Sequence, residues 1–279
     1  MKGSVRPRVS IGMPVFNEED YVADALDSLL GQSFGDFELI VSDNGSTDRT
    51  RQICEEYARK DRRIRYFRQQ RNRGATYNFN FVFEESKADY FMWAACDDRW
   101  SSDCLNEYVE SLESHPSAAL VFCHFRVYNF VTRELTDVPV TPSCHDSPVK
   151  NYLTRLRNAT PSMVYGLFRK KHFRQMVGRV ENFDFWDVYF THAMATSGNL
   201  LVIPRPLYTA GIRSKVRIPR SVTGGRLVYR NFYTRNIQLI MSHFSLLQAA
   251  WVIPYFTRWH WHLVRNTEAA IRRLQGNAA

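Results

Sequence analysis

The chain has few cysteines, and their spacing suggests no structural role for them. Five occur among 279 residues, an odd number, and none forms a C-x-x-C pair. This pattern argues against a disulfide framework or a zinc cluster and favours reduced thiols in the cytoplasm. The basic N-terminus lacks the apolar run and the small-residue cleavage site of a secretory signal. We therefore expect a cytoplasmic protein.

Three common nucleotide-binding and hydrolase motifs are also missing. No G-x-G-x-x-G follows the first predicted strand, no G-x-x-x-x-G-K-[ST] occurs, and there is no G-x-S-x-G. These absences exclude the dinucleotide-binding fingerprint, the phosphate-loop ATPases and the α/β-hydrolases. The eight histidines show no spacing typical of metal ligands.

Lysine is scarce, whereas arginine is abundant. The chain has seven lysines and 30 arginines, a net charge of +9 and a pI of about 9.4. Such a balance favours anionic partners, among them nucleic acid, an acidic membrane surface or a phosphorylated small molecule. The arginine-rich stretch 59–73 is interpreted as a helix end followed by a strand, because its aromatic residues fall within an apolar run. We expect no nucleic-acid partner.

The first half of the chain alternates strand and helix signals. Short apolar runs predict strands, and apolar residues at helical spacing predict the helices between them. Strands are expected at 9–15, 37–41, 64–67, 90–95 and 118–125, with helices at 19–30, 46–59, 75–85 and 103–114. This alternation predicts an α/β fold with a mostly parallel central sheet and helices on both faces.

The second half is less regular. Residues 136–148 contain three prolines, which predict a long loop. Beyond it we expect a helix at 183–196, a short strand at 200–203 and a basic loop at 214–225. The remainder of the chain is expected to be mainly helical. The segment 239–257 has no charged residue but is too polar for a membrane span. It is interpreted either as a buried helix that breaks before Pro254 or as an interfacial helix against a membrane.

Polar side chains follow the predicted strands, where ligands of parallel sheets bind. They are Asn17, Glu18, Asp43, Asn72, Asp97 and Asp98. Adjacent carboxylates such as Asp97 and Asp98 suit Mg²⁺ or Mn²⁺, or else cap the next helix. The carboxylate of Asp43 could accept a hydrogen bond from a nucleobase or a ribose hydroxyl. Alternatively, it only shapes the turn before the next helix.

The order and spacing of four motifs resemble those of the family 2 glycosyltransferases with a GT-A fold. The motifs are MPVFNEE (13–19), DNGSTD (43–48), NRG (72–74) and CDD (96–98). The resemblance covers roughly residues 8–125 and continues more weakly to about 215. It implies a nucleotide-diphospho-sugar donor, with a UDP-sugar favoured, a divalent cation (Mn²⁺ or Mg²⁺), and transfer with inversion at the anomeric carbon.

The resemblance also assigns roles to individual residues. Pro14 and Phe16 would line the base pocket, Asp43 would bind the base, and Glu18 and Asn72 would flank the donor. Asp97 would contact the ribose or the sugar, and Asp98 would ligate the metal. Relatives often carry D-x-D-D where this chain has ACDD, so Ala95 stands in place of one acidic residue.

An inverting transfer also needs a base that accepts the proton of the acceptor hydroxyl. Relatives place it at the start of a helix that ends about eleven residues later in a glycine. Asp187 lies eleven residues before Gly198 and is the predicted base, with Asp184 and Glu181 as alternatives. The simpler interpretation of Asp187 is a helix-capping residue.

Relatives often have a histidine near the diphosphate, on a loop where this chain has none. Arg213 and Lys215 are candidates for neutralising the diphosphate instead. We expect a metal-dependent glycosyltransferase of cell-surface polysaccharide or glycolipid synthesis, acting on a glycan or lipid-linked acceptor. The missing histidine motivates the alternative, a non-catalytic module that binds a nucleotide-sugar or a glycan.

The expected organisation is one glycosyltransferase domain followed by a helical extension. Residues 1–225 would form the domain, with 8–125 binding the donor and 126–225 the acceptor. Residues 226–279 are rich in aromatics and arginines, which suits an amphipathic surface that meets anionic headgroups. Peripheral attachment to the cytoplasmic face of a membrane, through about residues 226–273, is therefore predicted.

Overall fold

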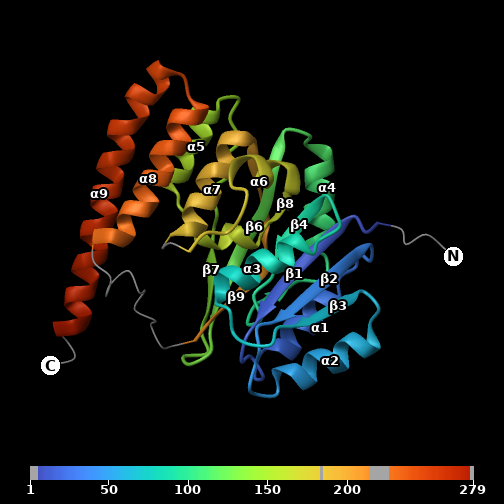
Figure 1. Ribbon diagram of the computed structural model, residues 1–279. Coiled ribbons are helices and arrows are strands. Elements are labelled where there is room, and N and C mark those ends of the chain that lie inside the picture. Colours follow the sequence, from blue (N-terminus) through green and yellow to red (C-terminus); the bar gives the residue numbers. More distant parts are fainter. Residues whose placement is uncertain (1–5, 183–184, 214–225, 277–279) are drawn as a thin grey trace.

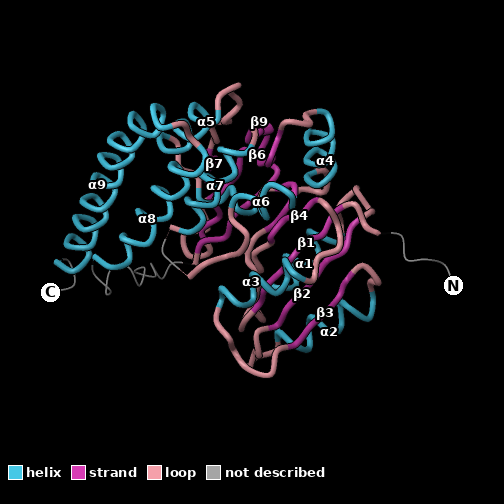
Figure 2. The backbone as a smooth tube through the Cα atoms, turned by 45° about the horizontal axis from the view of Figure 1, so that its top comes forward, coloured by secondary structure: helices cyan, strands magenta, loops and turns pink. Residues whose placement is uncertain are grey.

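The computed structural model describes residues 6–182, 185–213 and 226–276, with side chains described for 6–182, 185–213 and 231–261. Figures 1 and 2 show a central sheet with helices on both sides and two long helices together at one end of the molecule. The strands are β1 (Val9–Val15), β2 (Phe37–Asp43), β3 (Ile64–Arg68), β4 (Tyr90–Trp93), β5 (Arg99–Trp100), β6 (Ala118–Asn129), β7 (Leu135–Val138), β8 (Leu167–Arg169) and β9 (Asn199–Ile212).

The helices of the N-terminal half lie between these strands, as the alternation predicts. They are α1 (Val22–Leu30), α2 (Thr50–Lys60), α3 (Ala75–Glu84) and α4 (Cys104–Ser114). The later helices are α5 (Pro148–Arg157), a short 3₁₀ helix η1 (Pro161–Tyr165), α6 (Lys170–Met176), α7 (Trp186–Ser197), α8 (Arg226–His243) and α9 (Leu246–Gly276).

The strands join in the order β3-β2-β1-β4-β8-β6-β9-β5, with β7 paired to β6. Strands β3, β2, β1 and β4 are mutually parallel, whereas β8 is antiparallel to both β4 and β6. The central strands β1 and β2 are buried on both faces, which is why they appear in the sequence as nearly continuous apolar runs. The predicted fold class, a mostly parallel sheet covered on both faces, is confirmed.

Helix α3 packs closely on β1 and forms one wall of the site described below. A Cβ at Gly12 would lie 2.6 Å from Phe91 and 2.7 Å from Val82 of α3, so only glycine allows this approach. Asn78, also on α3, donates through Nδ2 to the carbonyl of Ser42 at 2.8 Å. These contacts set the position of α3 relative to the carboxyl ends of β1 and β2.

Two predictions for the second half are incomplete, because the loop is shorter and the strand is longer than expected. The expected loop 136–148 contains most of β7, which pairs with β6. The expected strand 200–203 is part of β9, which runs to Ile212 alongside β6. Pro204 and Pro206 obscured this strand in the sequence, because proline is normally found only at sheet edges or bulges. The pairing of β6 with β9 shifts register at this point, between Cys123 and His124, and so accommodates both prolines.

The C-terminal helices α8 and α9 form a hairpin, and the expected break before Pro254 is absent. Pro254 lies inside α9. It leaves the carbonyl of Ala250 without its helical donor, but both residues are exposed, so water can reach that carbonyl. Among the described residues, no helix is long and apolar enough to cross a membrane.

Helix α8 is joined to the rest of the fold through a buried polar cluster. Asn236 of α8 accepts from the hydroxyl of Tyr152 at 3.2 Å, and its Oδ1 lies 2.9 Å from Nδ1 of His192 on α7. All three side chains are buried. Burial lowers the pKa of His192 to about 4, because the charged imidazolium loses its hydration there. The hairpin is thus packed against α7, the helix that carries Asp187 in its first turn.

Candidate active site

The loops that follow β1 and β2 are hydrogen-bonded to each other. The backbone N–H of Asn17 donates to Ser46 Oγ at 3.0 Å, and that of Glu18 donates to Thr50 Oγ1 at 2.7 Å. Asn17 also accepts from the N–H of Thr47 at 2.9 Å and has a left-handed backbone, with φ of 55°. The motifs 13–19 and 43–48 therefore form one structural unit at the carboxyl edge of the sheet.

Asp43 is fully buried within this unit. Its carboxylate accepts from the N–H of Ser46 at 2.8 Å and from the hydroxyl of Tyr66 at 2.9 Å, and Arg68 Nε lies 3.7 Å away. The carboxylate thus shapes the turn after β2, as the simpler interpretation of this residue expects. Contact with a nucleobase, its other predicted role, would need these neighbours to move.

Asn72 also helps to build its own loop. Its Oδ1 accepts from Asn44 Nδ2 at 3.0 Å and from the N–H of Gly74 at 2.8 Å. Pro14 is half-buried in β1, whereas the ring of Phe16 is exposed just beyond the strand. Of the residues predicted to contact the base, Phe16 therefore presents the most accessible surface.

Three charged side chains meet beside these loops. Arg213, which follows β9, donates through Nη2 to Glu18 Oε2, and its Nε lies 3.1 Å from Asp97 Oδ2. Its guanidinium also lies 4.2 Å from the ring centroid of Tyr21. Burial raises the pKa of Glu18, and the ion pair with Arg213 opposes that rise. The structure thus brings together Glu18, Asp97 and Arg213.

Asp98 faces the protein rather than this cluster. Its Oδ2 accepts from the Tyr208 hydroxyl, and its Oδ1 accepts from the N–H of Gly211 at 2.9 Å. Burial raises the pKa of Asp98 to about 7, although both hydrogen bonds favour the charged form. Asp98 therefore attaches the CDD motif to β9, and Asp97 is the more exposed carboxylate of the pair.

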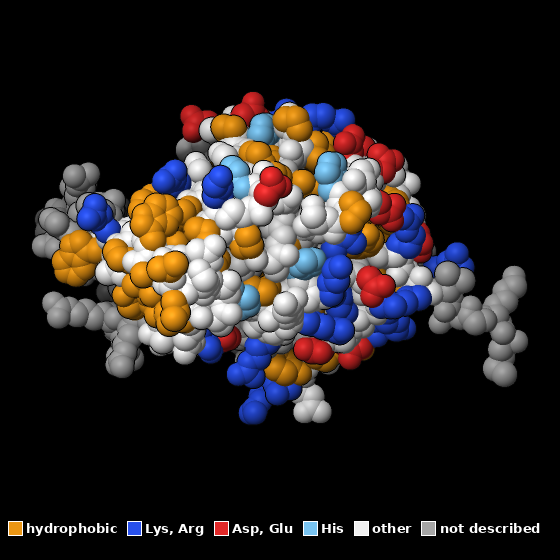
Figure 3. All heavy atoms as spheres, turned by 90° about the horizontal axis from the view of Figure 1, so that it is seen from above, with side chains coloured by type: hydrophobic (Ala, Val, Ile, Leu, Met, Phe, Trp, Pro, Cys, Tyr) orange, Lys and Arg blue, Asp and Glu red, His pale blue; other side chains and the backbone are white. Residues whose placement is uncertain are grey.

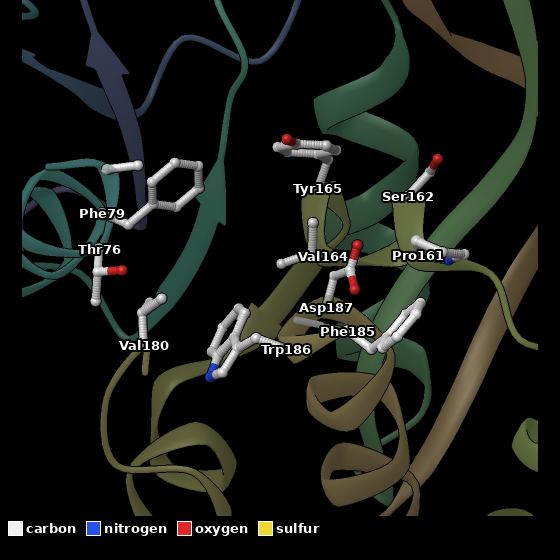
Figure 4. Close-up of a pocket in the computed structure, with 11 residues that line it drawn as sticks. Thr76, Phe79, Pro161, Ser162, Val164, Tyr165, Val180, Phe185, Trp186 and Asp187 are labelled. Atoms are coloured by element: carbon white, nitrogen blue, oxygen red, sulfur yellow. The ribbon is translucent and has the colours of Figure 1, made fainter. Parts of the chain in front are cut away.

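A pocket of about 460 Å³ opens between α3, η1 and the start of α7. Figure 4 shows aromatic rings around it, with the carboxylate of Asp187 among them. The lining residues include Thr76, Phe79, Tyr165, Phe185, Trp186 and Asp187. Asp187 lies in the first turn of α7, directly after Phe185 and Trp186. Phe185 has a left-handed backbone, with φ of 62°; such conformations are costly and are often found at functional sites.

Tyr165 relates this pocket to the acidic pair. Burial raises its pKa, and the negative charges of Asp98, Asp97 and Asp187 raise it further. The ring centroid of Tyr165 lies 6.0 Å from that of Tyr208, whose hydroxyl donates to Asp98. Tyr165 therefore lines the pocket and also packs on Tyr208, the residue that donates to Asp98.

The alternatives to Asp187 lie elsewhere. Glu181 pairs with Arg235 of α8 and lines a separate polar pocket of about 390 Å³. Asp184 and Lys215, the second diphosphate candidate, lie outside the described residues. Of the described candidates for the base, Asp187 is the one that lines the aromatic pocket.

Sequence reasoning missed the tyrosines of the site. Tyr21 lies beneath Arg213, Tyr208 donates to Asp98, and Tyr165 lines the pocket. None of them belongs to a recognisable motif, and Tyr208 is 110 residues from its partner. No local signal could have identified them, because their roles arise from long-range packing.

Comparison with known proteins agrees with this geometry. The model of the family described as glycosyl transferase family 2 matches residues 10–177, more than half of the chain. The chain belongs to glycosyl transferase family 2. The match contains the loops after β1 and β2 and the acidic pair, and it ends before Asp187 and Arg213. The candidate base and the arginine of the charged cluster in this family 2 member therefore lie outside the matched region.

Curated relatives of this family 2 chain include bacterial proteins named as glycosyltransferases. TuaG of Bacillus subtilis, named as a teichuronic acid biosynthesis glycosyltransferase, is 28% identical over 63% of this chain and 66% of its own length. EpsJ of the same organism, named as an uncharacterized glycosyltransferase, is 34% identical over 43% of this chain and 34% of its own. The chain thus spans less than two thirds of the length of these relatives.

Solved structures share the fold of this family 2 chain. TarS residues 1–349 of Staphylococcus aureus superpose with a TM-score of 0.70 at 17% identity, covering 93% of this chain and 73% of that one. Its complex with UDP-GlcNAc also gives a TM-score of 0.70. The mannosyltransferase PcManGT of Pyrobaculum calidifontis, solved with GDP-Man and Mn²⁺, gives 0.58 at 18% identity over 99% of this chain and 77% of its own.

Proposed function

We propose that this protein is an inverting glycosyltransferase that moves a sugar from a nucleotide-diphospho-sugar to an acceptor hydroxyl. The supporting observation is the position of Asp187, whose carboxylate lines an aromatic pocket together with Tyr165, which packs on the Asp98 partner Tyr208. Family membership supports the reaction class, and the name of TuaG supports a role in cell-surface polysaccharide or glycolipid synthesis. The acceptor would be a glycan or a lipid-linked sugar.

In this proposal the donor lies along the carboxyl edge of β1 and β2, and its sugar enters the pocket. The exposed ring of Phe16 stacks on the base. The acceptor oxygen attacks the anomeric carbon while the bond from that carbon to the diphosphate oxygen breaks. The acceptor proton passes to the carboxylate of Asp187, and the nucleoside diphosphate leaves. Attack opposite to the leaving group inverts the anomeric configuration.

The donor in this proposal is a UDP-sugar. The UDP and UDP-GlcNAc complexes of TarS support this class, although the likeness at 17–18% identity extends to the fold alone. Pro14, Asp43 and Asn72 contribute mainly by holding the loops that surround the nucleotide.

A divalent cation, Mn²⁺ or Mg²⁺, would neutralise the departing diphosphate when bound. Among the described residues, no three acidic, His or Cys side chains are grouped to hold a metal. One or two carboxylates together with substrate phosphates suffice for such ions, and Asp97 with Glu18 fits that requirement. We therefore transfer the ligand role that the sequence suggested for Asp98 to Asp97. Arg213, and Lys215 by sequence, would pair with the diphosphate.

The substitution Asp187→Asn tests this proposal. It removes the proton acceptor and nearly preserves shape, so we expect kcat to fall about 10²- to 10⁴-fold with donor affinity unchanged. Glu181→Gln is the matched control and should retain activity, because Glu181 lines the other pocket. Transfer from a UDP-sugar and donor affinity by calorimetry are the measurements. If the Asp187→Asn variant retained its turnover, Asp187 would be excluded as the base.

A non-catalytic module that binds a nucleotide-sugar or a glycan is the second candidate. The observation that favours it is Arg213, which engages both Glu18 and Asp97, the carboxylates available for a cation. Incubation of the chain with UDP-sugars and Mn²⁺ separates the two candidates. A glycosyltransferase slowly hydrolyses its donor without acceptor, whereas a binding module leaves the donor intact.

We also propose that residues 226–279 are a helical extension appended to a glycosyltransferase domain of residues 1–225. The extension packs on the acceptor half, through Asn236 against Tyr152 and His192. This placement supports peripheral attachment at the cytoplasmic face of a membrane, close to a lipid-linked acceptor. No nucleic-acid partner is proposed, because the basic stretch 59–73 contains the end of α2 and the whole of β3, as the sequence interpretation expects.

A further inference from the structure

Apolar side chains are exposed at the turn between α8 and α9. Leu246 is 79% exposed and Leu247 is 87% exposed, and Met241 and Trp251 are each more than half exposed. We call these four residues the hairpin tip. They are four of the nine large hydrophobic side chains that are exposed among the described residues, and they lie within eleven positions of one another. Figure 3 shows hydrophobic side chains gathered at this end of the molecule.

The hairpin tip is not needed for packing within the chain. Between Leu239 and Phe256 a second set of apolar side chains is buried against the fold: Leu239, Ile240, Phe244, Ala249, Val252 and Phe256. The hairpin therefore already has a complete inward face, and the tip points away from it. A contiguous exposed apolar patch of this kind marks an interaction surface.

The charges around the hairpin tip favour a negatively charged partner. No charged residue occurs from 236 to 257, and no Asp or Glu occurs from 226 to 267. Arginines stand on either side of the uncharged segment: Arg235 on α8, which also pairs with Glu181, and Arg258 on α9. Arg157 of α5 adds a third, since its Nε donates to the hydroxyl of Tyr255 on α9 at 3.0 Å. The polar residues at the tip, such as Ser242, Ser245 and Gln248, are neutral.

This arrangement matches the interface of an anionic lipid bilayer. Leucine and methionine side chains enter the region below the headgroups, tryptophan prefers the interface itself, and arginines pair with anionic headgroups. The centre of the patch contains no charged group, as insertion below the headgroups requires, because charges are costly to bury in a bilayer. We propose that the hairpin tip inserts into the surface of an anionic membrane. The proposal names the contact through which the peripheral attachment proposed above takes place and rests on that attachment, but it does not depend on sugar transfer.

Flotation of the full chain with lipid vesicles tests the proposal. We expect the wild-type chain to float with vesicles of phosphatidylglycerol and phosphatidylcholine, and much less with phosphatidylcholine alone. The double substitution Leu246→Ser with Leu247→Ser should reduce binding to the mixed vesicles at least about tenfold, because two leucines no longer enter the bilayer. Both side chains are exposed, so the melting temperature should not change.

The matched control is the pair Val131→Ser with Leu135→Ser, near the β6–β7 turn. Both residues are more than half exposed, as the leucines of the tip are, but they lie outside the hairpin. This control should float like wild type. Quenching by brominated lipid should also decrease in Trp251→Phe relative to wild type.

Three results would overturn the proposal. The first is equal flotation of the tip variant and the control variant. The second is equal binding to neutral and anionic vesicles, which would remove the role of the arginines. The third is a dimer, detected by light scattering, that the tip variant abolishes while no form of the chain floats; the tip would then be a contact between two copies of this chain. Loss of flotation in an active enzyme leaves the proposed reaction intact.

Discussion

At the carboxyl edge of β1 and β2, the side chains of the recognisable motifs are largely hydrogen-bonded within the protein. The pocket beside α7, in contrast, is lined by side chains from segments that are far apart in the sequence. Asp43, Asn72 and Asp98 each accept hydrogen bonds from nearby protein groups. In the pocket, Phe79, Tyr165 and Trp186 come from α3, η1 and α7. Motif residues can therefore be part of a scaffold, and pocket residues can lack any motif.

The largest expected effect separates the two members of the acidic pair. Asp97→Asn should lower kcat at least about 100-fold with an unchanged melting temperature, because Asp97 is the more exposed carboxylate beside the donor edge. Asp98→Ala should instead lower the free energy of unfolding by about 2–4 kcal/mol, because Tyr208 and Gly211 lose a buried acceptor. Transfer assays and urea unfolding measure the two effects. A stable, inactive Asp98→Ala would reverse the assignment.

The next effect concerns the seam between α7 and the hairpin. Burial lowers the pKa of His192 to about 4, so the unfolded chain binds more protons between about pH 6.5 and pH 4. The free energy of unfolding therefore has its full value, as far as His192 is concerned, above pH 6.5. It falls by about 3 kcal/mol in total as the pH decreases towards 4. His192→Phe should remove this part of the pH dependence, as urea unfolding at several pH values would reveal. An unchanged pH dependence in that variant would show that another group is responsible.

The smallest effect sharpens the role of the donor edge. Phe16→Ala should weaken binding of UDP about 5- to 100-fold, since one stacking contact between an aromatic ring and a base contributes roughly 1–3 kcal/mol. Trp261→Ala, on α9, is a suitable comparison, because its ring is also exposed but belongs to the C-terminal hairpin. Calorimetric titration with UDP measures the effect. Equal affinity of Phe16→Ala and wild type would place the base elsewhere.

The sequence predicted the N-terminal half well, because its elements are specified locally. Apolar runs such as β1 and β2 are buried on both faces, and the helices between them have helical periodicity. The second half was predicted less well, since β7, β8 and much of β9 are stabilised by pairing with β6. The prolines at 204 and 206 argued against a strand in the sequence. Only the register shift between β6 and β9 at this point explains how β9 accommodates them.

The candidate site divides in the same way. The spacing of Glu18, Asp43, Asn72 and Asp97 along the chain already indicates the carboxyl edge of a parallel sheet. The direction in which each side chain points could not be predicted, and it separates Asp97 from its neighbour Asp98. Both are aspartates next to each other in the sequence, but only Asp98 meets Tyr208 and Gly211 of β9.

By itself the sequence determined the alternating α/β architecture, the family motifs and the order of the acidic residues, because short-range periodicity and turn chemistry are written in neighbouring positions. Only the tertiary structure decided which carboxylates are enclosed, which arginine meets them, and which apolar side chains of the hairpin remain uncovered. Those properties depend on groups that are distant in the chain and become neighbours only when β9, α7 and the hairpin pack together.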